Sequence, residues 1–183
     1  QLFDAHEPRQ CHLVVREDGQ WFLLVVVQVP DGTPFPPTDF LGVDLGVINL
    51  AMTSDGIPHS GEGIEACRAR YATYRQRLQR AAHVAQMDGK RPKNIRRALK
   101  RTARREARFR RDTNHCISKK LVAAATGNGE GIALEDLTAI RTRTRFRKPQ
   151  RAKMTGWAFA QLRSFIEYKA QLAGVPVVLV DPK

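Results

Sequence analysis

Apolar residues in the first thirty positions follow the pattern of a β-hairpin. Residues 12–16 and 21–29 are two β-branched runs joined by Glu17-Asp18-Gly19, a turn sequence. Prolines and glycines then interrupt the pattern over residues 30–38, which predicts a linker and a domain boundary. Because a lone hairpin cannot bury its faces, we expect it to belong to a larger barrel whose other strands lie before Gln1.

The next unit is predicted to consist of short strands followed by two long helices. Residues 40–45, 47–53 and 57–60 read as strands, with a turn at Ser54-Asp55-Gly56. The period then changes to that of a helix over residues 64–86 and, after a break at 88–92, over residues 93–125. Residues 64–125 are therefore expected to form a helical hairpin.

The second of these helices separates apolar from basic positions. Its predicted inner stripe consists of Ile95, Ala98, Leu99, Thr102, Ala103, Phe109, Cys116, Ile117 and Leu121. The basic positions, which we expect to bind nucleic acid, are Arg96, Arg97, Lys100, Arg101, Arg104, Arg105 and Arg108. Such a helix can pack on a domain while its other side faces phosphates.

The remaining residues predict a return to an α/β pattern. Residues 132–137 form a buried strand, 155–173 a helix, and 175–180 a last strand. Between them, residues 141–155 have no apolar period and are rich in arginine and threonine. We therefore expect two units, residues 1–38 with the hairpin and linker, and residues 39–183 with a mixed α/β domain.

Charge is concentrated in two blocks. The net charge is +13, yet residues 1–67 carry −8, residues 68–111 carry +15, and residues 141–153 carry +7. Self-repulsion of this size favours a polyanionic partner over a merely solvated helix face. The block at residues 141–153 supplies further candidate nucleic-acid-binding residues, which are Arg141, Arg143, Arg145, Arg147 and Lys148. No apolar run is long enough for a membrane span, and three separated cysteines exclude a disulfide scaffold within these residues.

Two carboxylates are candidates for metal chemistry. Asp44 lies on a strand with Gly42 and Gly46 as its neighbours on the same face, and Glu135 ends a second apolar strand. If these strands pair in parallel, both carboxylates meet at one edge and offer hard oxygen ligands for Mg²⁺ or Mn²⁺. Two alternatives stay open: the glycines serve only bends while Asp44 caps a turn, and Glu135 and Asp136 only neutralise nearby arginines. Asp136 is expected on the opposite face, and Asp181 is a further candidate ligand.

An ordered set of segments resembles a known family. Its parts are Phe40–Ala51, Ser54–Gly56, the arginine-rich helical hairpin, Ile132–Leu137, Trp157 to Ala170 and Gly174–Pro182. Together they resemble the OrfB/TnpB proteins of bacterial insertion sequences, relatives of type V CRISPR effector nucleases. The resemblance implies an RNase H-like (RuvC-type) fold, a guide RNA, Mg²⁺-dependent cleavage of DNA and action at the nucleoid in the cytoplasm. Asp44 and Glu135 match the family's first two catalytic carboxylates, and residues 21–29 match the end of its wedge-like barrel.

The resemblance also defines what these residues lack. Family members continue into a four-cysteine zinc-binding insert and a last catalytic aspartate, and this sequence contains neither. We therefore expect a catalytically incomplete, nucleic-acid-binding part of a nuclease, with zinc only in the missing region. The alternative is a non-catalytic RNA- or DNA-binding module. An actin/Hsp70-like ATPase is less favoured, because residues 132–137 offer no second phosphate-binding turn.

Overall fold

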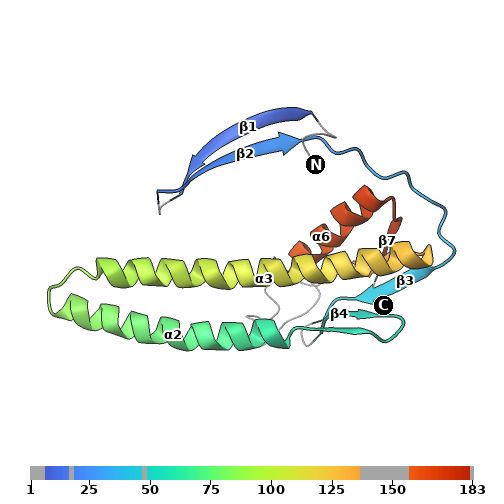
Figure 1. The fold of residues 1–183 in the computed structure, drawn as a ribbon. Coiled ribbons are helices and arrows are strands. Elements are labelled where there is room, and N and C mark those ends of the chain that lie inside the picture. Colours follow the sequence, from blue (N-terminus) through green and yellow to red (C-terminus); the bar gives the residue numbers. More distant parts are fainter. Residues whose placement is uncertain (1–6, 17–18, 47–48, 137–156, 182–183) are drawn as a thin grey trace.

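The computed structural model describes residues 7–16, 19–46, 49–136 and 157–181, which form a mixed α/β fold (Figure 1). The strands are β1 (Pro8–Val15), β2 (Trp21–Val27), β3 (Phe40–Asp44), β4 (Asn49–Thr53), β5 (Pro58–Ser60), β6 (Gly131–Glu135) and β7 (Val177–Val180). The helices are α2 (Glu62–Met87), α3 (Lys93–Asn128) and α6 (Trp157–Ala173). Among the described residues, no helix is long and apolar enough to cross a membrane.

Five strands form a mixed sheet in the order β5-β4-β3-β6-β7. The pairs β3–β4 and β4–β5 are antiparallel, whereas β3–β6 and β6–β7 are parallel. In the β3–β6 pair, Leu41 lies opposite Ile132 and Val43 opposite Leu134. The predicted parallel pairing of the strands that carry Asp44 and Glu135 is thus confirmed.

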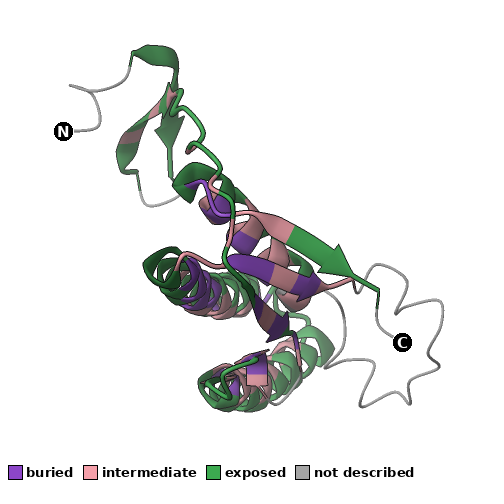
Figure 2. Cartoon of the chain, turned by 90° about the vertical axis from the view of Figure 1, so that its right-hand side faces the viewer, coloured by how far each residue is buried: buried purple, intermediate pink, exposed green. Residues whose placement is uncertain are grey.

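The core lies where the sheet meets α3 and α6. On β3 and β6, Leu41, Val43, Ile132 and Leu134 are almost fully buried. The buried helical positions that complete this core are Ile117, Leu121, Val122, Ala125, Leu162, Ile166 and Ala170. Figure 2 shows the consequence: buried residues gather in the sheet and on the inner sides of these helices, while the N-terminal hairpin is largely exposed.

Helix α3 ends at Gly129, where the chain needs a left-handed conformation. Gly129 has φ +69° and its N–H donates to the carbonyl oxygens of Ala125 and Thr126, which is a glycine C-cap. Strand β6 begins at Gly131 and packs against α3. The strand is parallel to β3, which in Figure 1 lies at the C-terminal end of α3.

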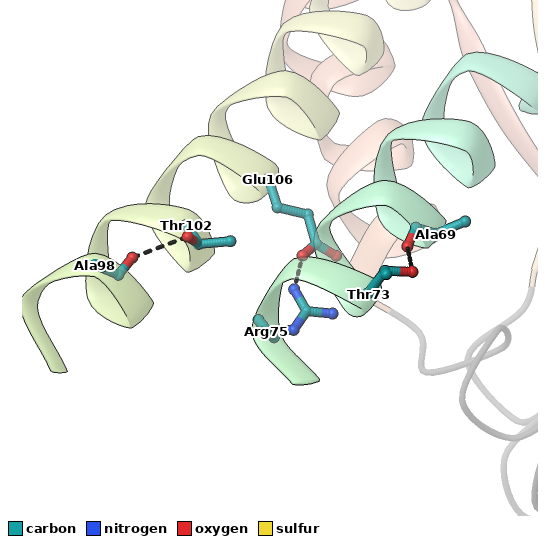
Figure 3. Close-up of polar contacts among 6 residues, drawn as sticks. All are labelled: Ala69, Thr73, Arg75, Ala98, Thr102 and Glu106. Atoms are coloured by element: carbon teal, nitrogen blue, oxygen red, sulfur yellow. Dashed lines mark hydrogen bonds and ion pairs between the residues drawn. The ribbon is translucent and has the colours of Figure 1, made fainter. Parts of the chain in front are cut away.

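The α2–α3 hairpin is held by a polar seam. Arg75 of α2 forms an ion pair with Glu106 of α3, and both side chains are largely shielded from solvent (Figure 3). Thr102 is buried and donates to the Ala98 carbonyl of its own helix at 2.8 Å. Only Cys67 of α2 is buried among the described residues, so this hairpin depends much less on apolar packing than the sheet does.

The N-terminal hairpin and linker are anchored differently. Strands β1 and β2 pair as predicted, but large apolar side chains on both remain exposed, for example Leu13 and Trp21 at 67 %. The linker, in contrast, is bonded to the domain: the Gly32 N–H donates to the Gln171 carbonyl at 3.0 Å. A Cβ at Gly32 would lie 2.3 Å from the backbone nitrogen of Gly174, so this crossing requires glycine.

Candidate active site and nucleic-acid interface

Asp44 is the last residue of β3 and is solvent-exposed, whereas its neighbour Val43 points into the core. The flanking glycines are in close contact with other residues of the same chain. The Gly42 N–H donates to Ser54 Oγ at 3.1 Å, and a Cβ at Gly46 would lie 2.9 Å from the Asn49 carbonyl oxygen. The space beside the glycines is therefore occupied by Ser54 and Asn49.

Asp44 and Glu135 lie side by side. They follow the paired residues Val43 and Leu134 at the carboxyl ends of two parallel strands. Burial, a hydrogen bond with the Asp44 carboxyl group and the charge of that group raise the pKa of Glu135 above its ordinary value. Two carboxyl groups, ninety-one residues apart in sequence, thus share one small region at the edge of the sheet.

The chemistry of this pair fits a hard divalent cation. Carboxylate oxygens are the ligands that Mg²⁺ and Mn²⁺ prefer, and a cation would relieve the repulsion between two like charges. Asp181 follows Val180, which pairs with Glu135 on the neighbouring strand. Within the described ranges, however, no three acidic, histidine or cysteine side chains converge on one point. The donor set seen here is therefore two carboxylates.

Asp136 takes the opposite direction, as strand alternation predicts. Its carboxylate accepts a hydrogen bond from Arg163 Nη1 at 2.9 Å, and Arg163 Nε donates to Glu167 at 2.8 Å. The hydrogen bond to Glu167 and, more weakly, that to Asp136 raise the pKa of Arg163 against the effect of burial. Arg163 thereby fastens the end of β6 to α6. The sequence analysis did not single out Arg163, although its i,i+4 spacing to Glu167 is a recognisable signal.

The seven predicted basic residues of α3 are all exposed. At 100° per residue, the positions from Arg96 to Arg108 lie within about 180° of the helix circumference. The opposite side, with Thr102 and Glu106, faces α2. The basic arc is defined here as Arg96, Arg97, Lys100, Arg101, Arg104, Arg105 and Arg108. The other candidates, Arg141, Arg143, Arg145, Arg147 and Lys148, lie outside the described residues.

A cleft that the sequence analysis did not identify lies beside the basic arc. It has a volume of about 690 Å³ and opens between α2 and α3. Its lining residues are Arg70, Tyr71, Thr73, Tyr74, Arg77 and Arg105. The α2 members recur at helical spacing on one side of that helix, but their meeting with Arg105 depends on how the two helices pack.

Comparison with known proteins places the chain among transposon-associated proteins. The OrfB_IS605 family, described as "Probable transposase", matches residues 15–145. The TnpB-like protein MJ0751 of Methanocaldococcus jannaschii is 36 % identical over 92 residues, which cover 50 % of this chain and 33 % of that protein. A protein of Streptomyces pristinaespiralis named "Putative RNA-guided DNA endonuclease" is 30 % identical over 184 residues, covering 98 % of this chain and 42 % of the relative.

A solved structure shares the fold of this chain. A cryo-EM structure of a Cas12f1–sgRNA–target DNA complex matches with a TM-score of 0.67 and 17 % identity, over 97 % of this chain and 37 % of that chain. The chain thus spans less than half the length of these relatives. The family match extends over most of the sequence and agrees with the resemblance noted from its motifs. The chain belongs to the OrfB_IS605 family, the group that includes TnpB-like proteins.

Proposed function

We propose that the chain is the RNase H-like (RuvC-type) nuclease region of an RNA-guided DNA endonuclease. The observation that carries the proposal is the meeting of Asp44 and Glu135 at the carboxyl ends of two parallel strands. Family membership and two similar proteins, one named a putative RNA-guided DNA endonuclease and one solved as a Cas12f1 complex with RNA and DNA, support the choice of substrate.

In this proposal, Asp44 and Glu135 hold Mg²⁺ or Mn²⁺. A divalent ion bound there would supply Lewis-acid activation of a phosphodiester and of water. The Asp136–Arg163 contact positions the end of β6, so that Glu135 keeps its place beside Asp44. The basic arc binds phosphates without reading sequence, which is left to base pairing with the guide RNA.

Two further parts of the proposal concern neighbouring regions. The exposed apolar side chains of β1 and β2 support the view that this hairpin is the end of a wedge-like barrel. A site with two carboxylates is also short of ligands for two ions. We therefore propose that the residues described here bind metal weakly by themselves and need a further carboxylate, with zinc confined to the family's cysteine-rich insert.

The test is guide-directed cleavage of DNA, with Mg²⁺, by a protein that contains these residues together with the further carboxylate. Asp44→Asn and Glu135→Gln keep the shape of the side chain but remove its charge. Each is expected to lower the cleavage rate by at least about a hundredfold, because losing a mere supporting contact in a metal site already costs about 10–100-fold. Asp55→Asn is the matched control, since Asp55 is an exposed aspartate in the turn after β4. Cleavage by Asp44→Asn at the unmodified rate would contradict the proposed site.

A second candidate function, binding without cleavage, is favoured by the basic arc alone. It predicts that affinity for RNA falls steeply with salt, because each neutralised phosphate releases counter-ions. Replacing Arg96 and Arg101 with glutamine is expected to make the log–log salt slope shallower by about 1 to 2. The matched control changes Lys119 and Lys120, two exposed cations in the other half of α3, to glutamine. Equal effects of the two pairs would remove the arc from the interface.

A further inference from the structure

The cleft between α2 and α3 is lined mainly by two kinds of side chain, arginines and tyrosines. It brings three guanidinium groups, from Arg70, Arg77 and Arg105, next to the rings of Tyr71 and Tyr74. Its volume of about 690 Å³ lies within the roughly 300–1,000 Å³ of small-molecule sites. The cleft is thus large enough for a ligand with both a negative charge and a planar ring.

The positive charge of the cleft is available to a ligand. Within the part of the chain that the structure describes, none of the three guanidinium groups forms an ion pair with a carboxylate. Glu106, the carboxylate next to Arg105 in sequence, is held by Arg75 in the seam (Figure 3). Concentrated cations without acidic partners favour a phosphate or another anion.

The aromatic side chains add a surface for stacking. Tyr74 is 46 % exposed, and Tyr71, three residues earlier on α2, is half-buried. The Arg70 guanidinium lies 5.1 Å from the centre of the Tyr71 ring, so one ring is already held in a cation–π contact. The Thr73 hydroxyl group donates a hydrogen bond to the Ala69 carbonyl, so the hydroxyl oxygen can still accept one. Rings beside guanidinium groups are the surface on which unpaired bases stack.

We propose that this cleft binds an unpaired nucleotide of a nucleic-acid strand whose backbone follows the basic arc. Arg105 belongs to both the arc and the cleft, so the two surfaces are continuous. The base stacks on Tyr74, and Arg70, Arg77 and Arg105 contact the flanking phosphates. A nucleotide within a duplex has no free face for Tyr74, so the strand must be unpaired at this point. The inference rests on the proposed nucleic-acid-binding function and deepens it.

The experiment measures binding of short labelled strands of equal length and charge: oligouridine, oligothymidine and an abasic strand. The protein is expected to bind a strand that carries bases about tenfold more tightly than the abasic strand, the effect of one stacked base. Both affinities are expressed relative to that of the abasic strand. A larger ratio for oligouridine identifies RNA as the ligand, and a larger ratio for oligothymidine identifies DNA.

Three variants assign this preference to the cleft. Tyr74→Ala is expected to remove most of it, whereas Tyr74→Phe keeps the ring and retains it. Arg80→Ala changes an exposed cation of α2 outside the cleft, so it should weaken both kinds of strand by the same factor. Tyr74 is exposed, so its replacement leaves the fold intact. An unchanged preference in Tyr74→Ala overturns the proposal.

Competition separates the nucleotide from other anions. Displacement by polyglutamate as effective as that by oligouridine would show that the cleft responds to charge alone and would overturn the proposal. Displacement by uridine monophosphate at concentrations similar to those of the strand would assign the cleft to a free nucleotide and overturn it as well. If base preference is absent while binding stays salt-dependent, only this inference fails. If no strand binds, the proposed nucleic-acid contact fails with it.

Discussion

The two halves of α3 show how neighbouring segments of one helix can serve different ends. Eighteen residues make five turns, so Arg96 and Asn114 lie at the same position around the helix, as do Lys100 and Ser118. Asn114 and Ser118 are fully buried against α6, whereas Arg96 and Lys100 are exposed. The face that packs on the domain in one half therefore becomes the basic arc in the other, where α6 and the sheet no longer cover it.

Burial on this helix therefore depends on which elements pack against each half, and the spacing of apolar residues in its sequence does not determine it alone. In the packed half, the buried polar side chains form hydrogen bonds with α6. Asn114 Nδ2 donates to Gln161 Oε1 at 3.1 Å, and Lys169 Nζ donates to Ser118 Oγ at 2.6 Å. In the outer half, the ion pair between Arg75 and Glu106 joins α3 to α2, and Thr102 is buried nearby with its hydroxyl bonded within its own helix.

The largest expected effect is a loss of unfolding free energy when an apolar side chain of α3 is shortened, and it should differ between the two halves of the helix. Leu121 is 1 % exposed, so Leu121→Ala should lower the free energy of unfolding by about 2–5 kcal/mol. Leu99→Ala makes the same change at a half-buried position of the outer half and should cost less than half as much. Urea denaturation measures both. Equal losses would show that the two halves are packed alike.

The second effect tests the polar seam. Glu106→Gln removes the carboxylate that Arg75 contacts and should lower the free energy of unfolding by about 1 kcal/mol, between the values for exposed and buried pairs. Hydrogen exchange should rise in α2 and the outer half of α3, with little change in the sheet. Lys90→Gln, which breaks an exposed pair with Asp88, is the control and should have almost no effect. A uniform rise in exchange would mean that the seam also holds the sheet.

At the pair formed by Asp44 and Glu135, a substitution is expected to raise the free energy of unfolding, by an amount comparable to or smaller than the loss at the seam. Without divalent metal, Glu135→Gln should raise the free energy of unfolding by roughly 0.2–1 kcal/mol, because it removes repulsion between neighbouring strands. Adding Mg²⁺ should raise the melting temperature of the unmodified protein more than that of the variant. Equal Mg²⁺ responses would place the ion elsewhere.

The smallest effect concerns pH. Burial, and then the charge of Lys120, lower the pKa of His59 from its ordinary value of 6.5. The unfolded chain then binds a proton at a higher pH than the folded chain, so stability falls as the pH drops below about 6.5. Above that value His59 is neutral in both states and contributes no slope. His59→Gln should flatten this part of the stability profile, and an unchanged slope would assign it to other groups.

The sequence alone allowed the strand order around the candidate site to be anticipated. A glycine-bounded strand before the helices and an apolar strand after them suffice to place Asp44 beside Glu135 once parallel pairing is assumed. The predicted inner stripe of α3 was less accurate. Phe109 and Cys116 are exposed, Phe109 at 43 %. A single stripe cannot describe a helix whose partner changes from α2 to the sheet and α6.

The cleft could not be predicted for a related reason. Its residues come from two helices, and their meeting depends on the side-chain pairing in the seam rather than on a local pattern. Arg163 is similar, since its contact with Asp136 joins α6 to the end of β6 across a separation of 27 positions. Local period predicts elements, but the contacts between elements define these sites.

The uninterrupted course of α3 has a mechanical consequence. Its 36 residues correspond to a length of about 54 Å, and no glycine or proline occurs between Asn94 and Thr126 to provide a hinge. The half that is fixed in the core therefore sets the orientation of the half that projects beyond it. The helix behaves as a stiff spacer, and a strand held along its projecting end stays at a constant separation from the two strand-end carboxylates.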